Sequence, residues 1–89
     1  MIKRSIESIV GKTITGVVVK RRKSEEISNI TNQIMLVFSD NTYYEIWENT
    51  YDAISSAGRV FPGGIEAARN YGSDVMEIII DVHMNKAFF

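Results

Sequence analysis

The chain has 89 residues, of which 45% are hydrophobic, and its 10 basic and 11 acidic residues leave a formal net charge of -1. This length suits one small domain, residues 1–89, with a thin core, and the near-neutral charge argues against a broad nucleic-acid surface, so a nucleic-acid partner is not expected. Because the chain contains no cysteine, neither a disulfide framework nor a thiolate metal site is available to stabilise it.

The N-terminal segment gives no sign of a targeting or membrane-spanning sequence. Residues 1–5 carry charges but lead into no unbroken apolar run, and a signal peptide or a membrane span needs such a run. We therefore expect a cytoplasmic protein without a membrane partner.

The first third of the chain predicts a short helix, a strand and a long connection. Four apolar positions share one side of a helix that a glycine is well placed to end: Ile2, Ile6, Ile9 and Val10, followed by Gly11. Residues 12–22 are rich in β-branched side chains, which favour a pleated surface, and they predict the first strand. Residues 20–32 are polar and have no period, so they predict a long connection.

A hairpin is the clearest local prediction. Two strand-like runs, residues 33–39 and 42–48, are separated only by Asp40-Asn41, a pair that tolerates the positive φ angles of a tight turn. With a two-residue turn, the facing pairs are Phe38 with Tyr43, Leu36 with Glu45 and Ile34 with Trp47 on one side, and Val37 with Tyr44 and Met35 with Ile46 on the other. Both sides are largely apolar, whereas a helical layer covers only one of them. We therefore expect a homo-oligomer, a dimer or larger, in which a second copy covers the other side.

The last part of the chain predicts two short helices and a strand. Residues 49–58 have a capping residue at their start and a glycine at their end, and residues 63–72 lie between glycines. From residue 75 onward apolar residues alternate with mostly polar ones, with Met76, Ile78, Ile80, Val82 and Met84 on the predicted core side. Together these elements predict an α+β fold, a small and mostly antiparallel β-sheet with short helices packed on one face.

The glycine pair Gly63-Gly64 is a candidate anion site. Two glycines at a helix start leave several backbone N–H groups uncovered, and such groups can hold a phosphate or a carboxylate. Arg59 lies just upstream and Arg69 one turn into the helix, so both are candidate ligand-binding residues. The alternative is purely conformational, because Pro62 forces an extended residue before it and the glycines allow a sharp turn. Neither a Walker loop nor a dinucleotide fingerprint fits the surrounding residues.

Aromatic residues near the hairpin add a possible platform for a nucleobase. Tyr43, Trp47 and Phe61 are candidate ligand-binding residues, because flat rings stack on bases and Tyr43 and Trp47 share one side of the predicted hairpin. The alternative is that these rings belong to the core, as aromatic residues in strands usually do. Rings and an anion site together would form a pocket for a small nucleotide, without a cofactor.

Two further groups carry weaker indications. The basic run of residues 20–23 can add positive charge to a pocket, although such runs are usually solvated and Glu25 and Glu26 partly neutralise this one. His83 shares its predicted strand face with Asp81 and Glu77, a spacing compatible with a metal or an acid–base pair but also typical of any solvent-facing strand. With one histidine and no activated nucleophile, the sequence favours neither a metal site nor an enzyme.

Three segments together resemble small phage-type proteins: residues 9–14, residues 36–46 and the glycine pair before a helix. Among these the chain is similar to phage-encoded anti-defence proteins of the Thoeris type, sponges for the cyclic nucleotide signals of bacterial immunity. The resemblance covers about half the chain, with hairpin and turn motifs that many families share. It implies a non-enzymatic homo-oligomer in the host cytoplasm that holds an adenine-containing signal without cleaving it. The chain departs from this type in being short.

The sequence thus supports two hypotheses. The first is a small non-enzymatic binding protein that sequesters a phosphate-containing, cyclic nucleotide signal. The alternative is a protein-interaction inhibitor or adaptor that blocks a larger complex through its sheet edge or aromatic face.

Overall fold

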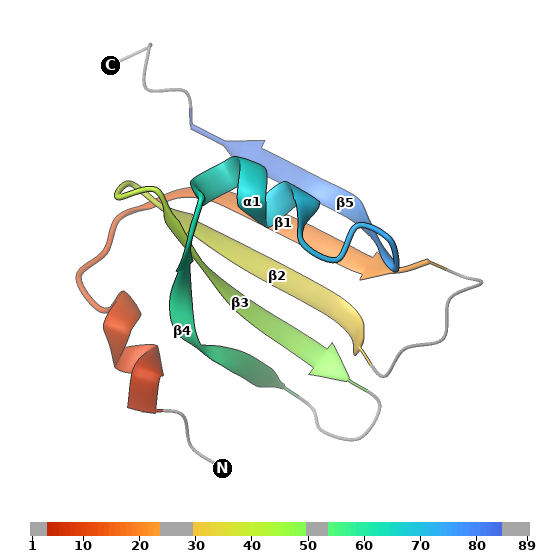
Figure 1. Ribbon diagram of the computed structural model, residues 1–89, viewed down its shortest axis with the longest axis horizontal. Helices are drawn as coiled ribbons and strands as arrows, with labels where there is room; N and C mark the ends of the chain where they lie inside the picture. The colour runs from red at the N-terminus through yellow and green to blue at the C-terminus, as the bar shows by residue number, and fades with distance from the viewer. Residues whose placement is uncertain (1–3, 24–29, 50–53, 85–89) are drawn as a thin grey trace.

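The computed structural model describes residues 4–23, 30–49 and 54–84. Their elements, in chain order, are the 3₁₀ helix η1 (Arg4–Ile9), β1 (Ile14–Arg22), β2 (Ile30–Phe38), β3 (Thr42–Asn49), β4 (Ser55–Pro62), the helix α1 (Gly64–Asn70) and β5 (Met76–His83). The five strands form one sheet in the order β4-β3-β2-β1-β5, and every neighbouring pair is antiparallel (Figure 1).

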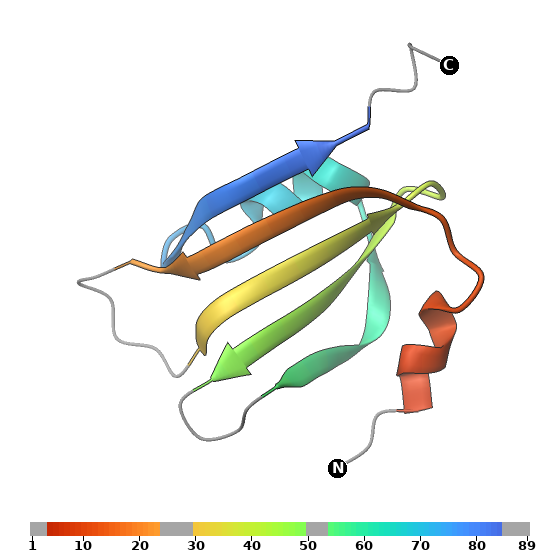
Figure 2. The ribbon, with the colours of Figure 1, turned by 180° about the vertical axis from the view of Figure 1, so that it is seen from behind.

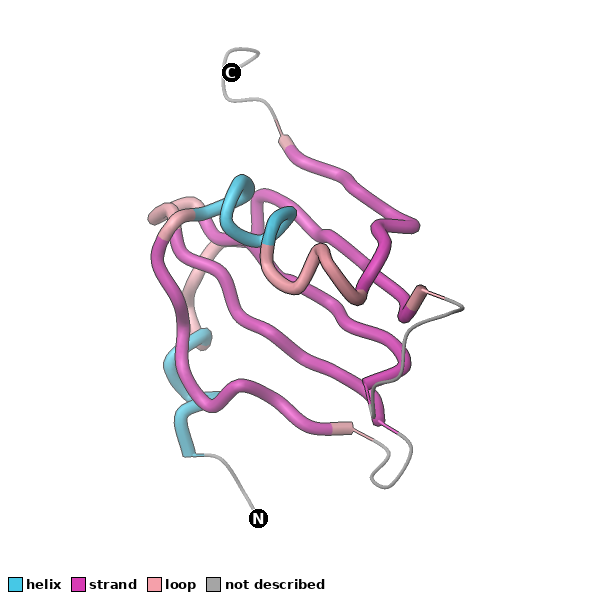
Figure 3. The backbone as a smooth tube through the Cα atoms, turned by 45° about the vertical axis from the view of Figure 1, so that its right-hand side comes forward, coloured by secondary structure: helices cyan, strands magenta, loops and turns pink. Residues whose placement is uncertain are grey.

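The two faces of the sheet are covered differently. Helix α1 packs across β1, β2 and β3 on one face, whereas η1 lies beside β4. Seen from behind, β5, β1 and β2 turn their other face to the viewer with no described element in front of it (Figure 2). The tube view shows α1 and the turn after it lying along the opposite face (Figure 3). The predicted α+β class with a small antiparallel sheet is confirmed in this coarse form, but the several helices on one face are wrong, because the described chain has only one α-helix.

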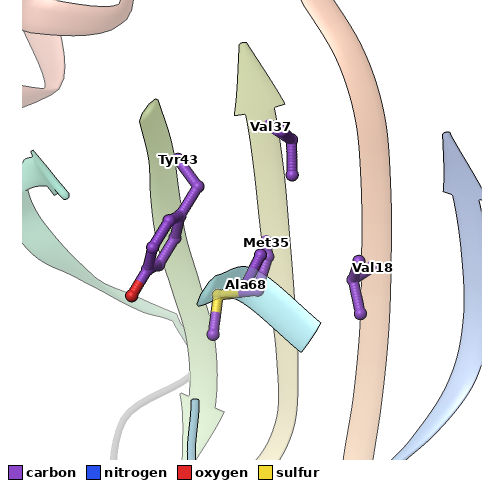
Figure 4. Close-up of a cluster of buried hydrophobic side chains, with 5 residues drawn as sticks. All are labelled: Val18, Met35, Val37, Tyr43 and Ala68. Atoms are coloured by element: carbon purple, nitrogen blue, oxygen red, sulfur yellow. The ribbon is translucent and has the colours of Figure 1, made fainter. Parts of the chain in front are cut away.

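The core lies between α1 and the middle of the sheet. Ala68 of α1 is fully buried above Met35 of β2, and Val18, Val37 and Tyr43 surround this contact (Figure 4). A small residue at this helix position allows the helix to approach the strands closely. The core is accordingly one layer deep, as a chain of this length predicts.

The hairpin between β2 and β3 is confirmed, but its predicted register is wrong by one residue. Val37 faces Tyr43 and Met35 faces Glu45, so three residues, 39–41, form the turn instead of two. The amide of Asn41 donates to the carbonyl of Phe38 at 3.1 Å, and Asn41 adopts a left-handed conformation with φ of 67°. This is the three-residue hairpin in which a left-handed residue follows a tight turn.

The side chain of Asp40 stabilises the longer turn. It accepts hydrogen bonds from the Thr42 amide at 3.2 Å, from the Thr42 hydroxyl and from the ammonium of Lys12. These bonds, that of Lys12 first, hold the pKa of Asp40 below its usual value. Asx-type bonding of this kind fixes a turn in a way that turn propensities alone do not reveal.

A strand, β4, begins within the segment predicted to form a short helix over residues 49–58 and covers its last four residues. The prediction is wrong for residues 55–58, whereas residues 50–53 lie outside the described part of the chain. Tyr43 pairs with Phe61 and Tyr44 with Val60, and the ladder then shifts around Gly58, whose φ is 87°. The small residues of this segment carry little strand propensity, so pairing with β3 decides its conformation.

The last strand does not keep the alternation that its sequence predicts. Val19 pairs with Ile80 but the next residue of β1, Lys20, pairs with Ile78, so a β-bulge lies between them. The bulge exchanges the faces of the later residues. Asp81, which pairs with Val18, and His83, which pairs with Gly16, therefore lie on the α1 side, and Val82 lies on the uncovered side.

Two predictions for the N-terminal half also need correction. The apolar residues of the predicted N-terminal helix do not form a packing stripe, because Ile6 in η1 is 49% exposed and Val10, just after η1, is 79% exposed; Ile2 lies outside the described residues. The predicted connection over residues 20–32 is shorter than expected, since β1 continues to Arg22 and β2 begins at Ile30. Backbone pairing between the two strands extends both into the polar region.

None of the helices among the described residues has the length and the apolar composition that crossing a bilayer requires.

Candidate functional site

A cavity of about 690 Å³ opens between the start of α1, the β2–β3 turn and the paired ends of β1 and β5. Its size falls within the range of small-molecule sites. The floor and walls combine apolar and polar groups: Thr15, Val37, Phe38, Ser39, Asn41, Ile65, Arg69, Asp81, His83 and Met84. Of the seven residues that the sequence suggests for ligand binding, only Arg69 lines this cavity.

Arg69 is held in place by two carboxylates. Its Nε and Nη2 donate to the two oxygens of Asp81 at 2.8 and 3.1 Å, and its Nη1 donates to Glu66 at 3.1 Å. The hydrogen bonds to Asp81, with a smaller contribution from Glu66, raise the pKa of Arg69. The bidentate geometry fixes the plane of the guanidinium at the cavity wall.

The two glycines are explained by the way the chain enters α1. The amide of Gly63 donates to the carbonyl of Asn41 at 3.1 Å, and a Cβ on Gly64 would lie 2.1 Å from the Asn41 side-chain oxygen. Their φ angles of 106° and 60° are left-handed, where glycine is favoured. Since α1 has only seven residues and its Gly64 is buried against the hairpin turn, the structure favours the conformational interpretation of the pair.

Arg59, Phe61 and Tyr43 come together, but as a packed stack on the edge of the sheet. The rings of Tyr43 and Phe61 lie 5.5 Å apart at 29°, and the guanidinium of Arg59 lies 4.8 Å from the centre of the Phe61 ring. Tyr43 is only 5% exposed, and its burial, with Glu45 and Tyr71 nearby, raises its pKa. The Tyr43 ring is therefore used by the core and offers no open face to a base.

Trp47 lies elsewhere on β3. It lines a second cavity of about 230 Å³, together with Asn32, Ile34, Ile46, Glu48 and Ile54. Trp47 lies four positions after Tyr43, which corresponds to roughly 13 Å along a strand. The two rings therefore do not flank one ligand, and the candidates from the sequence divide among the cavity, the stack at the sheet edge and this smaller hollow.

A buried polar cluster beneath the end of α1 was not anticipated. Lys20, Gln33 and Glu45 are at most 4% exposed, on three neighbouring strands. The ammonium of Lys20 donates to the Tyr71 carbonyl at 2.5 Å and the amide of Gln33 donates to Glu45. Burial lowers the pKa of Lys20, which Glu45 counteracts, and raises the pKa of Glu45, which Gln33 and Lys20 counteract.

The signal for this cluster was present in the sequence. Each of the three residues lies two positions from a core residue of its own strand, namely Val18, Met35 and Tyr43, and therefore on the same face. The basic run to which Lys20 belongs is not an open patch: the Nε of Arg21 donates to Glu77 at 2.8 Å, and the Nζ of Lys23 to the Asp74 carbonyl at 3.4 Å.

The bulge in β5 rearranges the acid–base candidates. Asp81 and His83 both line the cavity, whereas Glu77 pairs with Arg21 on the other side of the bulge. The sequence predicted that Glu77, Asp81 and His83 share one strand face; Asp81 and His83 do share a face and are exposed, but this face carries α1, and Glu77 lies on the opposite one. Within the described ranges, no group of three histidine, aspartate or glutamate side chains is placed to hold a metal ion.

Comparison with known proteins gives no relative for this site. No protein-family model matches the chain, and no curated protein and no solved structure is significantly similar to it. The assignment of function therefore depends on the geometry described above.

Proposed function

We propose that this protein is a non-enzymatic binding protein that sequesters a small phosphate-containing nucleotide in the 690 Å³ cavity. The observation that carries the proposal is the presence of one oriented guanidinium, Arg69, in a hollow of ligand size that is also lined by hydroxyl and amide side chains. An arginine held in a plane suits the planar recognition of phosphate oxygens.

Arg69 retains hydrogen-bonding capacity for such a ligand. A guanidinium has five N–H donors, and its three bonds to Asp81 and Glu66 leave two of them. The contact with Glu66 is weak, because that side chain is 76% exposed, so a phosphate can replace it. Asp81 then acts as the orienting partner of Arg69.

The remaining lining suits the rest of a nucleotide. The hydroxyl groups of Thr15 and Ser39 and the amide of Asn41 can bond ribose or base edges, while Val37 and Ile65 offer apolar contact. The proposal involves retention of the ligand without a chemical step. It agrees with the resemblance to phage sponges, with a site that shares only Arg69 with the residues that the sequence suggested.

Two measurements test the proposal. The purified protein is denatured by heat, and the filtrate is examined by absorbance near 260 nm and by mass spectrometry. The refolded or ligand-free protein is then melted with linear and cyclic adenine nucleotides, where saturation at 100 times Kd should stabilise the fold by about 2.7 kcal/mol. No released nucleotide, together with no rise in Tm for any nucleotide, would refute the proposal.

A pair of arginine variants locates the site. Arg69→Glu should abolish the stabilisation of the fold by nucleotide, because a carboxylate replaces the guanidinium that is proposed to donate hydrogen bonds to the phosphate. Arg59→Glu is the matched control: it makes the same charge change on the Phe61 ring, outside the cavity, and should leave the nucleotide-induced rise in Tm unchanged. If Arg69→Glu binds as well as the natural protein, the cavity is not the site.

A second candidate function has its own observation. Large apolar side chains on the edge strand β5 are 42 to 62% exposed, including Ile78, Ile80 and Val82. Exposed apolar edge strands mark sites where another chain adds a strand. A protein-interaction inhibitor or adaptor is therefore favoured if the nucleotide experiments fail.

A further inference from the structure

Strand β5 is an edge that the described chain leaves open. It pairs with β1 on one side and with no described strand on the other. After the bulge, Ile80 and Val82 of β5 and Met84, which follows the strand, are among the more exposed large apolar residues that the structure describes, at 48%, 62% and 49%. Ile80 and Val82 lie on the sheet face that α1 does not cover, whereas Met84 lines the cavity.

The direction of the free backbone groups of β5 follows from its pairing with β1. The amide of Met84 donates to the Thr15 carbonyl at 2.7 Å, so the backbone groups of Met84 point toward β1. In an antiparallel ladder the direction alternates from residue to residue. The amides and carbonyls of Asp81 and His83 therefore point outward, where a further strand would bind.

We propose that a second copy of this chain pairs antiparallel along β5, with the two-fold axis at Val82. In this register Val82 faces Val82 of the second copy as a pair without mutual hydrogen bonds. Asp81 and His83 face each other across the axis on both sides, as pairs that exchange backbone hydrogen bonds. This register requires that the backbone amides and carbonyls of Asp81 and His83 point outward, and the pairing of β5 with β1 gives them this direction.

Charge complementarity favours this register over the one centred on Asp81. A carboxylate then faces an imidazole twice, and opposite or hydrogen-bonding pairs stabilise antiparallel strands whereas like charges destabilise them. An axis at Asp81 would place this carboxylate against its own copy. An axis at Ile80 would include the bulge, where the strand is not regular.

The apolar groups also match. In this register Ile80 lies opposite Met84 of the second copy, next to the central Val82 pair, so these apolar side chains gain apolar neighbours across the seam. The two sheets become one continuous sheet, which removes an exposed apolar edge from each copy. The argument depends only on β5 and does not require that the cavity bind a nucleotide.

The pairing has a consequence for the cavity. Asp81 and His83 line the cavity of their own copy, and the register brings His83 of the second copy beside Asp81. Each cavity then has one wall completed by the partner. Asp81 still has lone pairs for this contact, because a carboxylate offers about four acceptor positions and Arg69 uses two.

Single cysteine variants test the register directly, since the natural chain has no cysteine. A disulfide needs Cβ atoms about 4 Å apart. The paired Val82→Cys residues meet this distance, whereas paired Ile80→Cys residues would lie roughly 13 Å apart along the strands. Mild oxidation should convert Val82→Cys to a covalent dimer at least tenfold faster than Ile80→Cys. Equal rates, or a faster rate for Ile80→Cys, would overturn the register.

Sedimentation velocity over a range of concentrations tests the dimer itself. The natural chain should sediment as a dimer, and Val82→Lys should raise the dimer Kd at least tenfold, because two ammonium groups meet on the axis. Ile54→Lys is the matched control: Ile54 is 73% exposed and lies away from β5, and its dimer Kd should not change. A natural chain that is monomeric at every concentration would overturn the proposal, as would a dimer that survives Val82→Lys unchanged.

Variants of His83 test the proposed pairing of Asp81 with His83 of the other copy. His83→Glu sets a carboxylate against Asp81 of the other copy and should raise the dimer Kd at least tenfold, whereas His83→Lys keeps an attractive partner and should not. Equal dimer Kd values for the two variants would overturn the pairing of Asp81 with His83. Failure of nucleotide binding with a dimer that behaves as described would leave this inference standing, so the two proposals are separable.

Discussion

The two edges of the sheet are built in opposite ways. Strand β4 contains a shift at Gly58, ends in Pro62 and has η1 beside it. Strand β5 has a row of exposed isoleucine and valine side chains. No other strand of the described chain pairs with its outer side. Proline, bulges and covering elements are the devices that keep an edge from pairing. The difference indicates that β4 is closed to other chains and β5 is open to one.

The interior contacts of the two edges differ in the same sense. At β4, Phe61 stacks on Tyr43 and carries Arg59, and the Tyr44 hydroxyl donates to the Ser56 hydroxyl at 2.8 Å. At β5, the only residue with a side chain buried in the core of the described chain is Met76, at the first position of the strand. The β4 edge therefore belongs to the fold of one chain, and substitutions at the two edges should have different consequences.

The largest difference is expected between Phe61→Ala and Val82→Ala. The first removes a ring packed between Tyr43 and Arg59 and should lower the free energy of unfolding by about 2–4 kcal/mol, somewhat below the range for fully buried aromatics. The second shortens an exposed side chain and should change it by less than about 0.5 kcal/mol in the monomer. Urea denaturation at low protein concentration measures both. Similar losses for the two variants would break the comparison.

The junction of β4 with α1 should show the next largest effect. Gly64→Ala should lower the free energy of unfolding by about 1–3 kcal/mol, because it adds left-handed backbone strain to a contact with Asn41. Gly11→Ala is the control, since Gly11 is also left-handed, with φ of 86°, but has no atom within 4 Å of the added Cβ. The free energy of unfolding should fall less for Gly11→Ala, and this smaller loss measures the left-handed backbone strain without the contact. A loss as large as that of Gly64→Ala would show that the Asn41 contact is unimportant.

The hydrogen bond that ties β3 to β4 should contribute about 1 kcal/mol. Tyr44→Phe and Ser56→Ala should each lower the free energy of unfolding by about that amount, and the double variant by less than the sum, because both remove the same bond. A thermal melt of the four proteins completes the cycle. Strict additivity would mean that the two hydroxyl groups do not interact in solution.

The smallest effect concerns the centre of the sheet, between the edges. Because burial raises the pKa of Glu45, the folded protein retains a proton that the unfolded chain releases from about pH 4.3 upward. Stability attributable to this group is therefore lost as the pH rises from there through the raised pKa of Glu45. Glu45→Gln should make the pH profile of Tm flatter in this window. An unchanged slope would show that Glu45 does not titrate abnormally.

Much of the secondary structure was predictable because its signals are local. The β-branched run of β1 and the turn residues between β2 and β3 identify strands and a hairpin, and the glycines around α1 mark both ends of a helix. The prediction failed for β4, whose serine, alanine and glycine residues have no strong preference. Its conformation depends on hydrogen bonds to β3, and a sequence read in short windows does not contain them.

The candidate site was less predictable, for a reason that the hairpin illustrates. One additional turn residue, stabilised by Asp40, changed every cross-strand pair of β2 and β3. One bulged residue in β5 moved Asp81 and His83 to the side of the cavity. Arg69, a candidate ligand-binding residue from the sequence, lines the cavity, yet its partner Asp81 is twelve residues away and reaches it only in the folded sheet.

The sequence by itself determined that the chain forms strands, a tight hairpin and a glycine-bounded helix, because propensity and turn chemistry act over a few neighbouring residues. The tertiary structure decided which residues face one another, where the cavity lies, which polar groups are buried and which edge remains open. Side chains alternate along a strand with a period of two. A shift of one residue therefore exchanges the faces, and only the pairing of distant strands fixes that shift.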